Sequence, residues 1–288
     1  MNSSAARKKN ILLIALLIPV SLILSGCADD DYAIEKRYWR VKKQADKILA
    51  NPHACPPNQL EKTVSALNSF SEKYPKSSLA VDAEFSIANL YIITKDYESG
   101  RAQLKKIIKK YEKSKELAAQ SVFFIGNSYE LEDKWPAALE QYKRILQNYP
   151  ETVKGIEIPI YIAQHYKVKF EPDKMNAALQ EAISHYKTMA ARYPLTPMSY
   201  TMDMLVAQCY SEMKDWQSTI NTLNAMLKTY NGKVSLEEIM LNLSAIYSQK
   251  LDNPAKAIEI LNVLIKEYPK SRYVNPAKDI IKRLSEKQ

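Results

Sequence analysis

Tyrosine–proline pairs punctuate this chain of 288 residues at nearly regular intervals. When two tyrosines without a following proline are included, the successive spacings are 37, 38, 44, 37 and 38 residues. The series consists of Tyr74, Tyr111, Tyr149, Tyr193, Tyr230 and Tyr268, and proline follows all of them except Tyr111 and Tyr230. Proline stops a helix, and a fixed period of this length is typical of stacked helical hairpins. The sequence therefore predicts an all-α, right-handed solenoid.

Small residues and tyrosines recur at the same offsets from each closing tyrosine. In the unit that ends at Pro150, Gly126 and Tyr129 fall on the first expected helix and Ala138 on the second. Small side chains let two helices approach closely, and larger ones fill the groove between them. The pattern resembles the tetratricopeptide repeat and predicts about six hairpins plus a C-terminal capping helix. The predicted packing residues are Ala88, Tyr91, Gly100, Gly126, Tyr129, Ala138, Ala163, Tyr166, Ala182, Ala207, Tyr210, Tyr247 and Ala257.

The unit that ends at Tyr193 is six or seven residues longer than its neighbours. The surplus lies between Tyr166 and Ala182, around the segment 170–173. Because Pro172 should break a helix, we expect either a longer loop between the two helices or an extended first helix that projects from the stack. Such an insertion is either a contact site of its own or neutral variation at a solvated turn.

The first 26 residues predict export. Three basic residues precede an apolar run over 11–24 that is short for a membrane span, and Leu24-Ser25-Gly26-Cys27 follows. This segment resembles the lipobox of bacterial lipoproteins, which implies cleavage before Cys27 and acylation of that residue. An uncleaved anchor or an ordinary secretory signal with a chance cysteine is the alternative.

The sequence is therefore divided into five segments. They are a cleaved signal peptide at 1–26, a lipidated tether at 27–31, an N-terminal helical hairpin at 32–75, tandem repeats at 76–272 and a capping helix at 273–288. By resemblance to Gram-negative sorting signals, alanine rather than aspartate at position 28 favours the outer membrane, with the protein on its periplasmic face.

Charge and composition argue against several classes of function. Residues 27–288 hold 38 basic and 32 acidic side chains, a net charge of about +6 that is scattered over helix surfaces. This distribution does not predict nucleic-acid binding. The five glycines are too dispersed for a phosphate-binding loop. We expect no cofactor and no small-molecule substrate.

Cysteines and histidines give no catalytic or metal-binding pattern. Cys55 and Cys209 fall in different units, so a disulfide between them is not expected; Cys209 is interpreted as a packed side chain and Cys55 as an exposed thiol. Cys55 also lies near His53, but two potential ligands are weak support for a metal site. The other histidines, His165 and His185, are interpreted as helix-face residues of one unit. We therefore expect no catalytic residues, no metal site and no enzymatic activity.

Together, the lipobox and the tyrosine–proline hairpins resemble the BamD (YfiO-like) lipoproteins of the outer-membrane β-barrel assembly machinery. The segments 73–78 and 121–126, with Ala83, read like repeats of that family. The resemblance implies a non-enzymatic scaffold whose partners are the barrel-forming subunit or unfolded outer-membrane proteins. Six units, one of them lengthened, depart from the five that the family carries.

Two alternative functions remain open. Periplasmic repeat proteins like CpoB of the Tol-Pal system share the tyrosine–proline rhythm, although they carry an N-terminal coiled coil and an ordinary signal. The third alternative is a peptidoglycan-acting enzyme that uses the repeats as a platform. In the scaffold hypothesis the surface formed by the first helices binds the partner, and the amides of Asn89, Asn127 and Gln164 are candidates to hold it.

Overall fold

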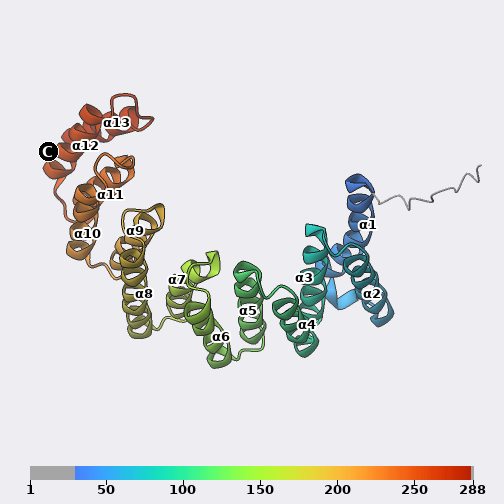
Figure 1. Ribbon diagram of the computed structural model, residues 1–288. Helices are drawn as coiled ribbons and strands as arrows, with labels where there is room; N and C mark the ends of the chain where they lie inside the picture. The colour runs from blue at the N-terminus through green and yellow to red at the C-terminus, as the bar shows by residue number, and fades with distance from the viewer. Residues whose placement is uncertain (1–29, 287–288) are drawn as a thin grey trace, which may run out of the picture. The chain divides into compact units, whose positions relative to one another are not determined.

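A computed structural model describes residues 30–286, and these form thirteen α-helices, one short 3-10 helix and no strand (Figure 1). The predicted all-α fold is confirmed, with six successive pairs of helices followed by a last single helix. The signal peptide and Cys27 lie outside the described residues. None of the helices in the described part of the chain is long and apolar enough to cross a membrane.

The chain divides into two compact units, 1–90 and 91–288, and the boundary falls within a helix. The boundary at 75/76, expected between the N-terminal hairpin and the tandem repeats, stays a prediction. The described part of the first unit contains α1 (Asp31–Ala50), the 3-10 helix η1 (Pro52–Ala54), α2 (Pro57–Lys73) and most of α3 (Ser78–Ile93). Helix α1 begins one residue inside the expected tether, since Asp30 caps it by accepting a hydrogen bond from the Ala33 amide.

The core of the first unit is built around Tyr38. Its side chain is fully buried, and its ring lies 5.4 Å from that of Phe70 on α2. The Tyr38 hydroxyl donates a hydrogen bond to Asp82 Oδ2 at 2.7 Å, which joins α1 to α3. Burial and this carboxylate both raise the pKa of Tyr38 above its ordinary value. The aromatic ring supplies the apolar contacts while its hydroxyl remains satisfied.

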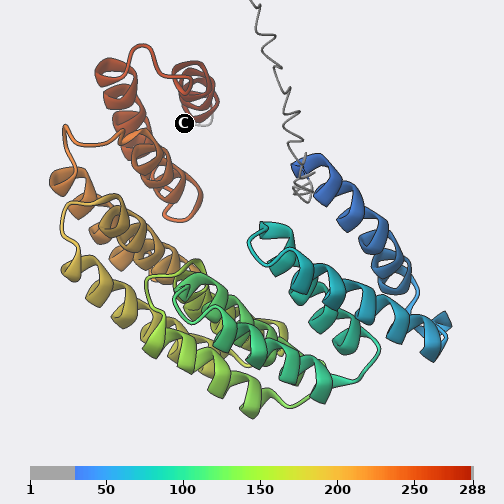
Figure 2. The same cartoon turned by 45° about the vertical axis from the view of Figure 1, so that its right-hand side comes forward.

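In the second unit the helices follow one another as antiparallel neighbours (Figures 1 and 2). The first helices of its complete pairs are α5, α7, α9 and α11, and the second helices are α6, α8, α10 and α12. The bounds are α4 Tyr97–Lys110, α5 Lys115–Glu130, α6 Trp135–Asn148, α7 Val153–Val168, α8 Pro172–Arg192, α9 Pro197–Glu212, α10 Trp216–Thr229, α11 Glu237–Gln249, α12 Pro254–Glu267 and α13 Val274–Ser285.

Each tyrosine of the sequence series ends a helix. Six helices, from α2 to α12, have their C-cap at one of these tyrosines. A serine or threonine three residues later often caps the next helix: the hydroxyl of Thr152 accepts from the Gly155 amide at 3.1 Å and donates to the Tyr149 carbonyl at 2.7 Å. The turn between repeats is therefore held at both ends by local hydrogen bonds.

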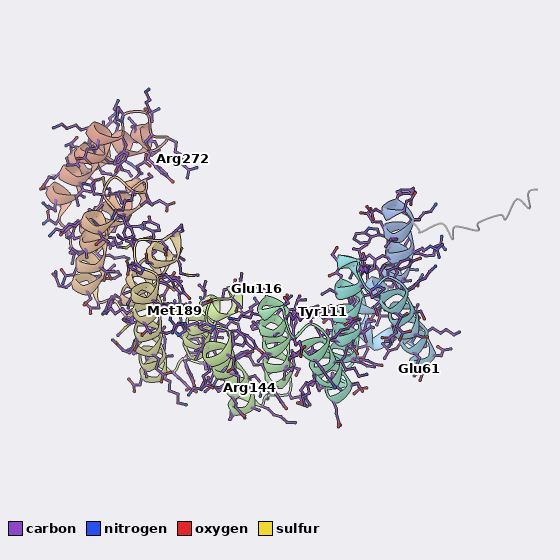
Figure 3. The ribbon with its side chains drawn as sticks, viewed as in Figure 1. Glu61, Tyr111, Glu116, Arg144, Met189 and Arg272 are labelled. Carbon is purple, nitrogen blue, oxygen red and sulfur yellow. The ribbon has the colours of Figure 1, made fainter. Side chains whose placement is uncertain are left out.

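The prediction for the lengthened unit was wrong. The turn between α7 and α8 is short, covering only 169–171, and α7 is as long as α5, with 16 residues each. The surplus lies in the second helix, because α8 has 21 residues where α6 has 14. Pro172 does not break this helix but begins it, at a position where the missing amide hydrogen costs nothing. Met189, labelled in Figure 3, is buried near the C-terminal end of α8.

The predicted packing residues fall into two groups by exposure. The small ones are all buried, and the tyrosines of the first helices are all half-buried. In α4, α6 and α12 the buried small residue is the fourth of the helix, but Ala182 is the eleventh residue of α8. Half-burial of the tyrosines fits an aromatic ring that packs inside while its hydroxyl reaches solvent or a partner.

Candidate partner-binding surface

An amide side chain follows the small packing residue in three successive first helices of the second unit. These amides are Asn127 on α5, Gln164 on α7 and Gln208 on α9; the equivalent residue on α11 is Ala245. Gln164 and Gln208 are exposed and Asn127 is half-buried. Gln208 was missed by the sequence analysis, although its place directly after Ala207 was the signal that identifies it. Asn89, in the first unit, is exposed and has the same relation to Ala88.

Helices α5 and α7 share an aromatic and polar face. The ring of Phe123 on α5 meets that of Tyr161 on α7 edge to face at 5.7 Å. The Lys154 ammonium lies 4.5 Å from the centre of the Phe123 ring. The Asn127 amide partly opposes the rise in the pKa of the Tyr161 phenol. Neighbouring first helices therefore contact each other directly and present two aromatic rings, one cation and one amide along a shared face.

Beneath this face, Glu130 receives two tyrosine hydroxyls. Tyr142 on α6 donates to Oε1 at 2.8 Å, and Tyr161 donates to Oε2 at 3.0 Å. Burial and the adjacent carboxylate raise the pKa of both phenols, so both remain donors at neutral pH. The carboxylate thus ties α5 to both α6 and α7 and fixes the first helices relative to each other.

A hollow on the first-helix surface lies between α9 and α11, with α10 at its base. Its volume is about 430 Å³. Polar side chains surround an apolar floor, and the lining includes Gln208. The residues that line it are Thr201, Met204, Leu205, Ala207, Gln208, Ser211, Glu212, Thr219, Leu223, Asn242, Ala245 and Ile246. The small side chain of Ala245, which takes the place of an amide, leaves room for a guest on the α11 side. An apolar floor with two rim amides suits an extended peptide segment, whose backbone needs both donors and acceptors.

A second hollow, of about 580 Å³, opens at the turns between paired helices. Phe170 is 92% exposed at its edge, in the left-handed backbone region with φ 57°. Lys250 lies over the ring of Trp216 at 5.6 Å, and Lys167 forms an ion pair with Glu212 at 2.7 Å. The turns of three successive hairpins thus share this hollow.

The C-terminal part of the second unit holds a third hollow of about 450 Å³. It is lined by Ser235, Glu237, Glu238, Ser271, Arg272 and Tyr273. The guanidinium of Arg272 (Figure 3) lies 4.8 Å from the centre of the Tyr273 ring. Its charged lining consists of two glutamates and one arginine.

The histidines and cysteines lie apart from these hollows. The imidazole of His165 stacks on the indole of Trp135 with ring centres 3.3 Å apart. Cys209 is buried in α9, and burial raises the pKa of its thiol to about 12. Cys55 is half-buried rather than exposed as predicted, and both cysteines are free thiols. Within residues 30–286 no cluster of histidine, cysteine and acidic side chains could hold a metal ion.

Two family models match the sequence. Residues 175–287 match the YfiO family, described as outer membrane lipoprotein, and residues 125–152 match the tetratricopeptide repeat. The resemblance to BamD-like lipoproteins is thereby confirmed. The YfiO match lies C-terminal to the segments 73–78 and 121–126 on which the resemblance was based. It covers the hollow between α9 and α11 in full.

Comparison with solved structures gives matches of low identity, and the three described next have TM-scores below 0.5. One is a tetratricopeptide repeat protein from Parabacteroides merdae ATCC 43184, with 9% identity, a TM-score of 0.37 and coverage of 81% of this chain and 80% of that one. BtubC from P. vanneervenii has 13% identity, a TM-score of 0.41 and coverage of 88% and 92%. The apo form of RapI has 13% identity, a TM-score of 0.44 and coverage of 87% and 84%. No curated protein matches the sequence.

Helical repeats of this kind serve as surfaces for other proteins, since their stacked hairpins expose extended faces and each hairpin contacts only its neighbours. The family matches therefore indicate a protein-interaction scaffold whose residues 175–287 are similar to the YfiO outer membrane lipoprotein family.

Proposed function

We propose that this protein is a non-enzymatic, lipid-anchored scaffold that binds proteins during β-barrel assembly at the periplasmic face of the outer membrane. The hollow between α9 and α11 carries the proposal, because it lies wholly within the residues that match the outer membrane lipoprotein family. The partner is a barrel-assembly subunit or an unfolded barrel protein, in an extended or helical segment.

The polar composition of this surface supports binding rather than chemistry. Gln208 and Asn242 can each donate and accept hydrogen bonds with a peptide backbone, and Met204 and Leu223 offer apolar contact. Methionine adapts its shape to different guests, which suits a scaffold that receives more than one sequence.

A second candidate function is coordination of the cell envelope in the manner of CpoB. The contact site that this candidate predicts is the aromatic face of Phe123, Asn127 and Tyr161 on α5 and α7, where residues 125–152 match the tetratricopeptide repeat. The two functions predict different contact sites, one on α9 and α11 and the other on α5 and α7.

Site-specific photocrosslinking separates the two functions. A photoreactive residue at Gln208 should capture a barrel-assembly subunit or barrel precursor from detergent-extracted membranes, and one at Asn127 should not. Asn224, exposed on the second helix α10, is the matched control position. Capture of only Tol-Pal or cell-wall proteins, at either position, would overturn the assembly function.

The anchor is tested separately by Cys27→Ser. We expect this variant to leave the outer-membrane fraction, because three acyl chains bind a bilayer far more strongly than a protein surface alone. Mass spectrometry of the mature N-terminus should show acylated Cys27 in the wild-type protein. An unmodified Cys27, or cleavage at another residue, would refute lipid anchoring. Neither result would contradict the proposed scaffold function.

A further inference from the structure

Helix α1 presents aromatic and basic residues on the side opposite its packed face. Tyr38, Ala45 and Ile48 are buried against the rest of the first unit. On the other side, Tyr32 is 71% exposed and Trp39 is 58% exposed. A single exposed hydrophobic side chain is normal, but two large aromatic side chains on one helix face form an apolar patch, and such a patch can mark a contact site.

The cations of α1 gather around these two aromatics. At about 100° per residue, Tyr32, Lys36, Trp39 and Lys43 fall within about 60° of one another around the helix axis. All four are exposed, and the Lys36 ammonium lies 6.0 Å from the centre of the Tyr32 ring. We name this group the α1 outer face.

The charge of α1 is unbalanced. The helix has six basic and three acidic residues, and one of the acids, Asp46, is paired with Lys42 at 2.6 Å. Arg40 and Lys47 flank the outer face and are also exposed, and Glu35 is the exposed acid beside it. Tyrosine, tryptophan and lysine are the residues that favour the boundary between lipid headgroups and water.

The length of chain before α1 limits what can cover this face. Tyr32 is five residues after Cys27, so its backbone cannot lie farther than about 18 Å from an acylated cysteine. Acyl chains in a bilayer would therefore hold the start of α1 near the headgroups at a high effective concentration. A weak affinity of the outer face for lipid then suffices to lay the helix on the surface.

We infer that the α1 outer face is a membrane-contact surface that binds the anionic headgroups of the bilayer into which Cys27 is anchored. The aromatic rings enter the interfacial layer, and Lys36 and Lys43 pair with lipid phosphates. Only the positioning of the helix near a bilayer rests on the proposed lipid anchor; the affinity of the face for lipid is a property of α1 itself.

Vesicle flotation of the mature chain with Cys27→Ser tests this affinity without the acyl chains. This protein should float with vesicles that contain phosphatidylglycerol and stay in solution with phosphatidylcholine alone. Binding should weaken with added salt, because exposed charges are screened beyond about 10 Å at 0.1 M ionic strength. Failure to bind anionic vesicles overturns the inference and leaves the lipid anchor untouched.

Charge reversal localises the contact. Lys36→Glu with Lys43→Glu should lower the affinity for anionic vesicles by roughly tenfold or more, since each lysine near an anionic surface contributes about 1 kcal/mol. The matched control is Lys105→Glu with Lys106→Glu, which makes the same change in net charge on exposed positions of α4. Equal loss in both variants would mean that the attraction is general and would overturn the assignment to α1.

Trp39 reports the depth of insertion. Brominated lipid in anionic vesicles should quench part of the protein fluorescence, and Trp39→Phe should remove that quenching. Trp216→Phe should leave it in place, because Trp216 is half-buried in the second unit. If quenching persists in Trp39→Phe, another surface contacts the lipid and the inference is wrong. Circular dichroism checks that each variant remains folded.

Discussion

A side-chain carbon placed on Gly126 would lie 2.4 Å from Cε1 of Tyr142. The two residues come from α5 and α6, and the fully buried Tyr142 ring occupies the space that any other residue at position 126 would need. The close packing of the Tyr142 ring thus accounts for glycine at position 126.

Gly126→Ala should therefore destabilise the protein. The Tyr142 ring must shift, and overpacking of this kind typically costs about 1–3 kcal/mol. Urea unfolding of the purified mature chain measures the change. Ala102→Gly, at an exposed position of α4, is a control for a small change in a helix and should cost about 1 kcal/mol or less. Unchanged stability of Gly126→Ala would contradict the close contact.

Tyr142 and Glu130 should be energetically coupled through their hydrogen bond. Tyr142→Phe and Glu130→Gln are each expected to cost about 1–3 kcal/mol, because each leaves a buried polar group with a poorer partner. The double variant should lose less free energy of unfolding than the sum of the two single variants, with a coupling energy of at least about 0.5 kcal/mol.

Tyr186 provides the control for this cycle. Its hydroxyl donates to the Ile156 carbonyl at 2.7 Å and has no contact with Glu130. The losses of Tyr186→Phe and Glu130→Gln should therefore add. Additive losses in the Tyr142 cycle as well would show that the Glu130 bond contributes no coupling.

Alkaline pH should weaken the fold partly through Cys209. Burial raises the pKa of this thiol to about 12 in the folded protein, whereas an unfolded chain ionises it near about 8.5. Below the pKa of the unfolded chain, the thiol is protonated in both states and its contribution to folding stability is fully present. As pH rises toward 12 the unfolded state alone loses the proton, so stability falls by at most about 1.4 kcal/mol per pH unit from this group.

Cys209→Ala should consequently show a shallower loss of stability between pH 9 and pH 11, in unfolding curves recorded at each pH. Val206→Ala, another buried residue of α9, removes no titrating group and should keep the slope of the wild-type protein. An unaltered slope in Cys209→Ala would mean that the thiol is not the group responsible.

Phe170→Gly should stabilise the turn between α7 and α8. A bulky residue in the left-handed region is strained by about 1–2 kcal/mol, and its 92% exposed ring gains little packing in return. Because glycine gives the unfolded chain more conformational entropy, which offsets part of the relieved strain, we expect a net gain of about 1 kcal/mol or less. Asp133→Gly, at the equivalent turn with φ 57°, should gain less because aspartate tolerates this conformation better.

Thermal unfolding of the two turn variants measures these gains. If Phe170→Gly lowers the melting temperature, the Phe170 ring makes stabilising contacts in spite of its exposure, and the expected gain is wrong. If the variant is more stable but captures less partner in crosslinking, Phe170 acts in binding at the second hollow.

The helical repeat could be predicted from the sequence because the residues that end each helix act locally. A tyrosine at the C-cap, a following proline and a small residue on each helix act within a few residues, so their spacing predicts the helices directly. The capping hydroxyl of Thr152 was equally local, and its recurrence three residues after several of the tyrosines was a signal that could have been used.

The site was less predictable, since it depends on which faces meet. Asn127 and Gln164 were selected because they lie off the packing pattern, and the same criterion selects Gln208. That a hollow forms at α9 and α11 depends instead on Ala245 replacing an amide and on Leu223 forming the floor from α10. The lengthened helix was placed wrongly because Pro172 has two opposite meanings: it ends a helix that precedes it and begins one that follows it.

The extra length of α8 bears on how such repeats can change during evolution. The interval that ends at Tyr193 exceeds the shortest interval by seven residues, and seven residues turn an α-helix through nearly two full revolutions, with a drift of only about 20°. An added heptad therefore leaves the buried stripe from Ala178 to Met189 facing the same way, whereas an addition of five residues would rotate it by about 140° toward solvent. A second helix lengthened by seven residues should therefore be more common among related repeats than one lengthened by five.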